Sequence, residues 1–205
     1  MLARPTVRLA KLEDAPAIAR FSRDFIEQGL AWSYTRARIA HAIQRKTTNV
    51  AVIDECEALR GFGIMDYGDT AAHLVLLGVQ ATARRRGLGA HILSWLEQCA
   101  VTAGILRVGV EARADNPRAI AFYQRQGYRV QRRIPGYYQG ILDGVRLEKS
   151  LATSRNEPHA RADAQGSAIT GRLPASTEFA IRSKPPQNNL CCPSSCPASP
   201  SRSTR

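Results

Sequence analysis

The stretch that decides the fold is His73-Leu-Val-Leu-Leu-Gly-Val-Gln-Ala-Thr-Ala-Arg-Arg-Arg-Gly-Leu-Gly-Ala90, because it joins two regular patterns through one basic turn. Residues 73–79 are almost unbroken apolar and too short to span a membrane, which favours a strand buried on both faces of a sheet. After Gly87 the apolar residues recur at helical spacing, at Leu88, Ile92, Leu96 and Ala100. The sequence therefore predicts a buried strand that leads through a turn into a helix N-terminus.

This turn has the properties of an anion site. A helix N-terminus offers about four free backbone N–H groups and the positive end of the helix dipole. Gly87 and Gly89 let a phosphate approach the backbone, and Arg84–Arg86 add positive charge. Two nucleotide motifs fit poorly: Gly-Leu-Gly-Ala replaces the Gly-Lys-Ser/Thr of a P-loop, and Ile92 stands where a dinucleotide fingerprint needs a third small residue.

Two segments carry a family resemblance. Arg84-Arg85-Arg86-Gly87-Leu88-Gly89 has the form Gln/Arg-x-x-Gly-x-Gly/Ala and resembles the acyl-coenzyme A pyrophosphate loop of the GCN5-related N-acetyltransferase (GNAT) superfamily. The second hallmark of that superfamily, a helix beside the pantetheine, is matched by Asn116, Ala119, Phe122, Tyr123, Gly127 and Tyr128. The resemblance covers roughly residues 5–151 and implies acetyl-coenzyme A as co-substrate.

Within the superfamily, the chain is most similar to the ribosomal-protein-alanine N-acetyltransferases, which acetylate a protein α-amino group. Residues 110–116 resemble their Leu-Glu-Val-Arg-Ala-Ser-Asn segment, and Tyr137-Tyr138 resembles a Tyr-Tyr pair in their last loop. Ala112 and Asp115 are mild departures, whereas a different loop at residues 135–145 leaves the acceptor open.

The resemblance implies a role for each site residue. Glu111 would be the general base and Tyr123 the general acid. The predicted cofactor-binding residues are Leu77, Val79, Arg84, Arg85, Arg86, Gly87, Leu88, Gly89, Ala90, Asn116 and Tyr123. The predicted acceptor-binding residues are Trp32, Tyr34, Tyr137 and Tyr138, although Trp32 and Tyr34 are equally compatible with packing under a loop.

The chemistry agrees with these roles. Acetyl transfer to an amine needs a neutral amine, a stabilised oxyanion and a proton for the departing thiolate. An α-amine titrates near pH 8 and a lysine near pH 10, so a single carboxylate suffices for the α-amine. A backbone N–H near Val79 is the expected oxyanion donor, and Gly78 is consistent with a bulge that opens a slot for pantetheine. The structural alternatives are a salt bridge from Glu111 to Arg113 and core packing of Tyr123.

The remaining pattern predicts an α+β (α/β) domain of the GNAT fold over residues 1–151. We expect a mixed central sheet of about 6–7 strands with a splayed parallel central pair, flanked by about 4 helices. The expected strands cover residues 7–10, 49–54, 59–67, 73–79, 106–112, 128–134 and 144–149. Residues 152–205 are rich in Ser, Pro, Ala and Arg without a period, which predicts a disordered low-complexity tail. A basic interaction tail and a dispensable extension both fit it.

Charge and composition bear on the ligand, on metal binding and on the cellular location of the protein. The net charge is +12, but residues 152–205 hold 7 basic and 3 acidic residues against 22 and 14 in residues 1–151. An acidic ligand such as coenzyme A explains this surplus about as well as nucleic acid does. The five cysteines and four histidines lack zinc-ligand spacing, so we expect free thiols and no metal. No long apolar run or leader pattern occurs, which predicts a cytoplasmic protein.

Three functions remain to be compared. The first is acetylation of a protein N-terminus by a monomer or weak homodimer. The second is acetylation of a polyamine, aminoglycoside or amino acid, for which Asp66, Asp69 and Asp143 are candidate acidic groups. The third is a non-catalytic acyl-coenzyme A sensor or a basic nucleic-acid-binding protein.

Overall fold

A single seven-stranded sheet organises the molecule in the computed structural model, which describes residues 5–55 and 58–152. The tail predicted from residue 152 onward lies outside the described residues apart from Ala152. The strand order is β1-β2-β3-β4-β5-β7-β6. The strands are β1 (Val7–Leu9), β2 (Thr48–Glu55), β3 (Ala58–Tyr67), β4 (Ala72–Val79), β5 (Arg107–Arg113), β6 (Arg129–Tyr138) and β7 (Leu142–Ser150). The predicted mixed sheet is confirmed.

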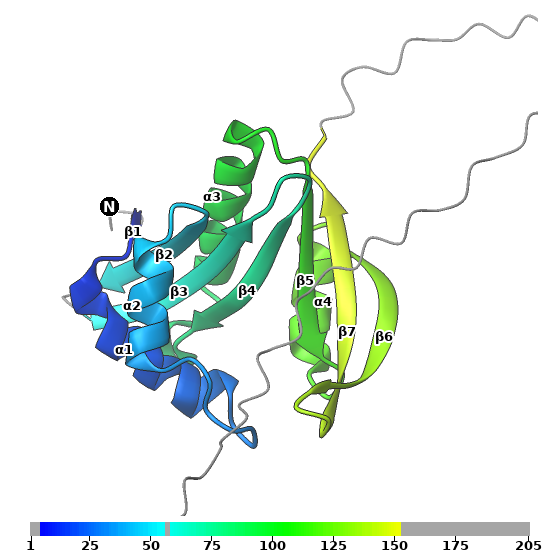
Figure 1. The fold of residues 1–205 in the computed structure, drawn as a ribbon, viewed down its shortest axis with the longest axis horizontal. Helices are drawn as coiled ribbons and strands as arrows, with labels where there is room; N and C mark the ends of the chain where they lie inside the picture. Colours follow the sequence, from blue (N-terminus) through cyan, green and yellow to red (C-terminus); the bar gives the residue numbers. More distant parts are fainter. Residues whose placement is uncertain (1–4, 56–57, 153–205) are drawn as a thin grey trace, which may run out of the picture. The chain divides into compact units, whose positions relative to one another are not determined.

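Helices cover both faces of the sheet (Figure 1). On one face lie α1 (Ala15–Phe21), which continues as a π-helical turn (Ser22–Ile26), and α2 (Arg36–Gln44). On the other face lie α3 (Leu88–Thr102) and α4 (Pro117–Arg125). Two short 3₁₀ turns, Leu12–Asp14 and Ala81–Ala83, complete the described elements. Each face has its own apolar core, so the sheet is the middle of three layers.

The long helix α3 packs close to the sheet because β3 carries glycine where they meet. A Cβ added to Gly63 would lie 2.8 Å from Cγ2 of Ile92 and 2.9 Å from Cδ1 of Leu96. Both of these side chains are fully buried. Gly63 therefore sets the distance between α3 and the sheet, and with it the position of the basic turn that precedes α3.

The two central strands separate after a short parallel contact, and candidate site residues lie where they part. β4 pairs with β5 only over Ala72–Leu74 and Val108–Val110. Beyond that point the two strands diverge in a V, as Figure 1 shows. The far half of β4 is hydrogen-bonded to β3 alone among the described residues, so one of its edges has unpaired backbone groups. The splayed parallel pair predicted from the sequence is confirmed.

The irregularity in β4 differs from the expected one. Met65 faces Leu74 and Ile64 faces Leu76, so the extra residue is Val75 and the prediction of a bulge at Gly78 is wrong. Gly78 instead allows a close approach of α1. A Cβ on Gly78 would lie 2.7 Å from Cε1 of Phe21.

Three further expectations changed in detail. The strand expected to be buried on both faces leaves Leu77 and Val79 partly exposed, because β5 does not cover the far half of β4. Leu106 lies before β5 rather than in it and is 48% exposed. The sixth strand continues to Tyr138 instead of ending at residue 134, so the two tyrosines expected in a loop lie at a strand end.

Candidate active site

The basic turn holds its backbone open at the start of α3. Gly87 is the N-cap residue in the left-handed conformation, with φ of 78°, and nothing lies within 4 Å of where its Cβ would be. The Nε of Arg84 donates to the carbonyl of Val79 at 3.2 Å. Arg86 forms two hydrogen bonds with the carboxylate of Glu55, at 2.8 and 2.5 Å. Arg86 thus has a protein partner, whereas the backbone of the turn stays accessible.

A basic hollow lies next to this turn. It is lined by Arg85, Pro117, Arg118, Ala121 and Arg125. No acidic side chain forms a salt bridge with any of its three arginines in the described part of the chain. Three cations without a protein counter-ion make the hollow suited to a phosphate group.

Three predicted cofactor residues also have structural roles. The side chain of Leu88 is buried in the core, so only its backbone faces the turn. Gly89 packs against Val79 and Phe122, at 3.5 and 3.6 Å from its Cβ position. The side chain of Asn116 caps α4 by accepting from the backbone N–H of Ala119 at 3.1 Å.

Glu111 lies at the apex of the V, one residue beyond the last β4–β5 pair. Its Oε2 lies 2.5 Å from Nε2 of His73 and accepts a hydrogen bond from the Tyr137 hydroxyl at 3.2 Å. Its Oε1 lies 3.2 Å from a terminal guanidinium nitrogen of Arg146. The Glu111 side chain is 4% exposed, so these three groups surround it on β4, β6 and β7. The alternative salt bridge to Arg113 is wrong, because Arg113 pairs with Asp115.

These partners decide the protonation state of Glu111. Burial alone would raise its pKa, since it disfavours the charged carboxylate. The hydrogen bond and charge of His73, the charge of Arg146 and the Tyr137 hydrogen bond outweigh burial and hold the pKa of Glu111 below its usual value. Glu111 is therefore a carboxylate at neutral pH, and a weaker proton acceptor than an unpaired glutamate.

The exposed member of this cluster is His73. Its side chain is 32% exposed, whereas that of Glu111 is almost fully covered. Because an ionised carboxylate only accepts, Oε2 of Glu111 favours the tautomer of His73 with the proton on Nε2. Nδ1 of His73 then has a free lone pair, which can accept a proton from a substrate.

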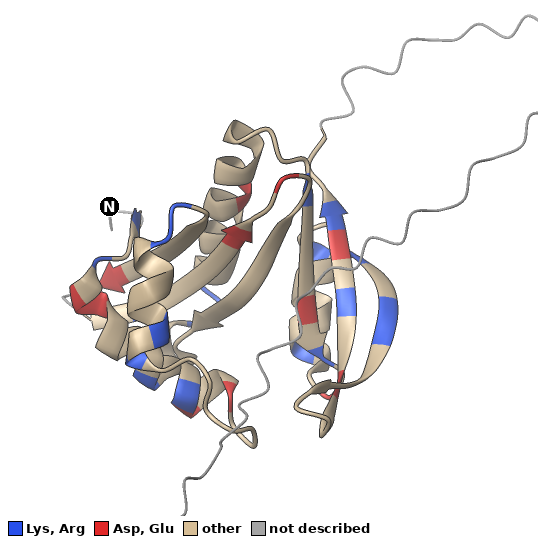
Figure 2. Cartoon of the chain, viewed as in Figure 1, with Lys and Arg blue, Asp and Glu red and all other residues tan. Residues whose placement is uncertain are grey.

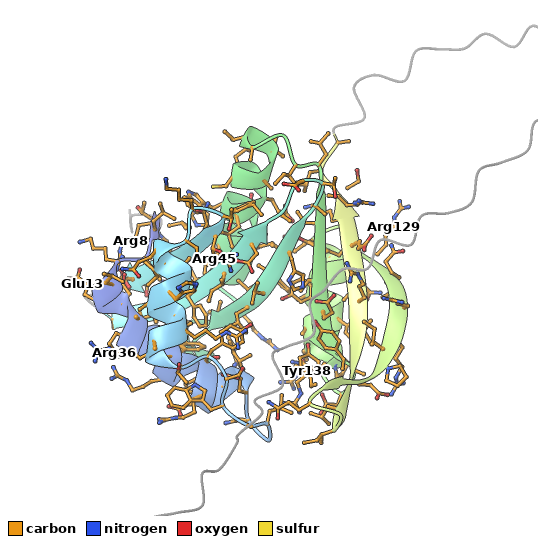
Figure 3. All side chains as sticks on the ribbon, in the orientation of Figure 1. Arg8, Glu13, Arg36, Arg45, Arg129 and Tyr138 are labelled. Carbon is orange, nitrogen blue, oxygen red and sulfur yellow. The ribbon has the colours of Figure 1, made fainter. Side chains whose placement is uncertain are left out.

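Two tyrosines from the end of β6 cover the same cluster. Tyr138 donates to the backbone carbonyl of Glu111 at 3.0 Å, and its ring meets that of Tyr137 edge to face at 4.9 Å. Figure 3 shows Tyr138 on the side of β5 that faces the V. Burial raises the pKa of both tyrosines, which keeps the phenols protonated at neutral pH.

Tyr123 lies deeper, on α4. It is buried in the core against the rings of Phe122 and Tyr128, at 5.2 and 5.6 Å. Its hydroxyl makes no hydrogen bond to any residue that the structure describes, and burial raises its pKa. Core packing and a protonated phenol coexist at this position, so packing does not exclude a role as a proton donor.

The connector between the π-helical turn and α2 is tied to the β6–β7 turn. Gln139 exchanges two hydrogen bonds with the backbone of Ala31, at 2.9 and 2.8 Å. The connector carries Trp32, whose indole N–H donates to the carbonyl of Tyr34, and Tyr34 stacks under the guanidinium of Arg38 at 4.2 Å. These two aromatic residues therefore have packing partners in a segment bridged to the rim of the site.

Sequence reasoning missed His73 and Arg146. His73 is the first residue of the quoted stretch and pairs in register with Gly109 on β5. Arg146 faces Glu111 directly in the antiparallel β5–β7 pair. Both contacts depend on register, which requires knowing where each strand pairs; the alternation of residues along single strands does not reveal them.

The fold and the site combine two diverging parallel strands with a basic, open turn at the start of α3. The model of the acetyltransferase (GNAT) family matches residues 14–128, so the chain belongs to this family. An uncharacterized N-acetyltransferase of Methanocaldococcus jannaschii is 32% identical over 94 residues, which are 45% of this chain and 59% of that protein. The catalytic subunit of the N-terminal acetyltransferase B complex of Schizosaccharomyces pombe is 36% identical over 66 residues, 32% of this chain and 37% of that protein.

The fold agrees with solved structures. The crystal structure of the ribosomal-protein-S18-alanine N-acetyltransferase from Escherichia coli has a TM-score of 0.62 at 22% identity, and the likeness covers 75% of this chain and 99% of that one. Other structural neighbours were solved with acetyl-coenzyme A or coenzyme A bound. At this level of identity the likeness shows the fold. The chain spans less than two thirds of the length of the two relatives matched by sequence.

Other features of the described residues are few. No described helix is long and apolar enough to cross a membrane. Cys99 is a free thiol, and the other four cysteines lie outside the described residues. No cluster of three or more potential metal-binding side chains occurs in residues 5–55 and 58–152.

Proposed function

We propose that the protein is an acetyl-coenzyme A-dependent N-acetyltransferase that acts on the α-amino group of a protein N-terminus. The observation that carries this proposal is the Glu111–His73 pair at the apex of the V. Family membership supports the acetyl donor, and the chemistry of the pair supports an amine acceptor.

The acetyl donor can be placed on the open turn and the basic hollow described above. The pyrophosphate of acetyl-coenzyme A would lie on the open turn at Gly87, and the basic hollow would hold its further phosphate. The pantetheine would run along the far half of β4, past Leu77 and Val79, where the strand has unpaired backbone groups. A backbone N–H near Val79 is the proposed oxyanion donor.

The reaction follows from these positions. The neutral amine attacks the thioester carbonyl carbon, and the amine proton passes to Nδ1 of His73, whose Nε2–H is held by Glu111. The carbon–sulfur bond then breaks, and the thiolate takes a proton from the Tyr123 hydroxyl. In this scheme Glu111 serves as the base through His73 instead of contacting the amine itself, because its side chain is almost fully covered.

The acceptor class follows from charge. A small polycation needs free carboxylates, but Asp143 accepts from Arg133 and from the backbone N–H of Gly136, each at 2.9 Å. Asp66 accepts from the hydroxyl of Thr48. Asp69, the third candidate, lies in the turn between β3 and β4, before the half of β4 that pairs with β5. With Asp143 paired to Arg133 and Asp69 at that end of the strand, a polyamine or aminoglycoside has few free carboxylates beside the unpaired half of β4. An α-amine is also neutral in larger fraction near pH 7 than a lysine is.

A thiol-release assay with acetyl-coenzyme A tests the proposal. The full chain is supplied with N-terminal peptides, with lysine peptides blocked at the α-amine, and with spermidine and an aminoglycoside. Release with the free N-terminal peptides supports the proposal. Release with the small amines alone would assign the second function, and tight coenzyme A binding without release would favour a sensor.

A further inference from the structure

Glu111 has two carboxylate oxygens with different neighbours, and one neighbour comes from β7, on the side of β5 opposite to β4. Oε2 faces His73 and Tyr137, whereas Oε1 faces Arg146 on β7. The arginine side chain is only 16% exposed and also holds Glu148, from Nε to Oε1, at 3.0 Å. One planar guanidinium therefore bridges two carboxylates that stand on neighbouring strands.

The strands fix this bridge from both sides. Arg146 and Glu148 alternate with Leu147 and so point to the same face of β7. Figure 2 shows basic and acidic residues following each other along this strand. The same face of β5 has Gly109 next to Glu111, and a Cβ there would lie 3.5 Å from a terminal nitrogen of Arg146. The guanidinium thus lies over β5, in the room that Gly109 leaves.

We propose that Arg146 is a positioning residue, which holds Oε1 of Glu111 so that Oε2 is presented to His73. This inference rests on the proposed function, to which it adds a residue that acts through Glu111 and never touches substrate. Without Arg146, the carboxylate could rotate about its last bond, and His73 would lose the fixed acceptor that selects its tautomer.

Arg146 also affects the ionisation of Glu111. The groups that contact this carboxylate are His73 from β4, Tyr137 from β6 and Arg146 from β7, while Tyr138 donates to the backbone carbonyl of Glu111. The charge of Arg146 is one cause of the lowered pKa of Glu111, so its removal is expected to move the pKa of Glu111 upward. Lys at this position would restore the charge but not the bridge, because an ammonium lacks the planar fork.

The test uses Arg146→Gln, which keeps a hydrogen-bond donor beside Glu111, together with Arg146→Lys. The control is Arg132→Gln. Arg132 pairs in register with Arg146 on the adjacent strand β6, is exposed and forms no salt bridge with a described carboxylate. Thermal unfolding of each full-length variant first establishes that it is folded.

The first readout is the carboxyl ¹³C titration of Glu111 in protein labelled at glutamate, with Glu111→Gln used to assign the signal. The midpoint should rise in Arg146→Gln and stay at the wild-type value in Arg146→Lys and Arg132→Gln. An unchanged midpoint in Arg146→Gln overturns the inference. This readout needs no acceptor, so it can overturn the contact between Arg146 and Glu111 even if the proposed function fails.

The second readout is turnover with an N-terminal peptide. The kcat of Arg146→Gln should fall on the order of tenfold, part of the roughly 10²–10⁴-fold that proton transfer contributes, with KM for acetyl-coenzyme A unchanged. Arg146→Lys should recover part of the loss, and Arg132→Gln should match the wild type. If the wild type turns over while Arg146→Gln keeps its full kcat, the function stands and the positioning role is refuted.

Discussion

The imidazole of His73 and the carboxylate of Glu111 face each other across the only two parallel strands in the described sheet, 2.5 Å apart, where those strands begin to separate. One side of the pair is buried under Arg146 and the other is reached through His73. In the proposed mechanism, this arrangement lets a buried carboxylate support an accessible base, His73.

Replacing Glu111 with Gln should lower kcat by about 10²–10⁴-fold with an N-terminal peptide. The amide keeps the shape of the side chain but carries no charge to stabilise a protonated His73. Steady-state kinetics measures the loss. Glu13→Gln, an exposed position on the first 3₁₀ turn, is the control and should be silent. A wild-type rate and pH profile in Glu111→Gln would remove Glu111 from the mechanism.

Replacing His73 with Ala should reduce kcat to a similar degree, since the proton would lose its acceptor. His41→Ala, on the exposed side of α2, should not change the rate. If His73→Ala keeps the wild-type kcat while Glu111→Gln does not, Glu111 acts without His73, and the proposed proton transfer to His73 is wrong.

Replacing Tyr123 with Phe removes the proposed proton donor and leaves the packed ring in place. We expect kcat to fall about 10²-fold or more, with little change in thermal stability. Tyr128→Phe is the matched control, because that hydroxyl donates to Glu97 at 3.0 Å in the core. Tyr128→Phe should lower the unfolding temperature and keep kcat. If Tyr123→Phe instead lowers the unfolding temperature and keeps the wild-type kcat, Tyr123 is a packing residue only.

The basic hollow predicts a change in donor binding. Arg118→Ala combined with Arg125→Ala should raise KM for acetyl-coenzyme A and leave kcat unchanged, because the lost contacts bind ground state and transition state equally. An acetyl donor that lacks the 3′-phosphate should show a smaller difference between wild type and variant. If the double variant raises KM by the same factor with both donors, the hollow does not bind this phosphate.

The close contact between α3 and β3 predicts a stability change. Gly63→Ala should destabilise the fold by about 1–3 kcal/mol, because the added methyl group meets Ile92 and Leu96 at less than 3 Å. Gly109→Ala should be tolerated, since its Cβ would meet its nearest neighbour at 3.5 Å. Urea unfolding compares the two. Equal stability of both variants would mean that α3 moves away without loss.

The sequence predicts those parts of the structure that depend on local pattern. Gly87 marks the start of the helix that follows the basic turn, because turn and cap geometry is set by single residues. The position of Glu111 follows from alternation along one strand. The partners of Glu111 could not be predicted in the same way, because they come from three other strands and a shift of one residue in any of them would turn the side chain to the other face. The bulge at Val75 is such a shift of register. The sequence favours a bulge at Gly78 instead, because glycine within a strand often marks one.

Locating the acetyl group on a single acceptor tests the central claim most directly. A peptide with a free α-amine and one internal lysine is incubated with the full-length protein and acetyl-coenzyme A, and fragment mass spectrometry assigns the modified nitrogen. We predict acetylation of the α-amine alone, at a rate about 10²–10⁴-fold lower in Glu111→Gln. Acetylation of the lysine side chain, or of neither amine while coenzyme A binds, would contradict the proposed function.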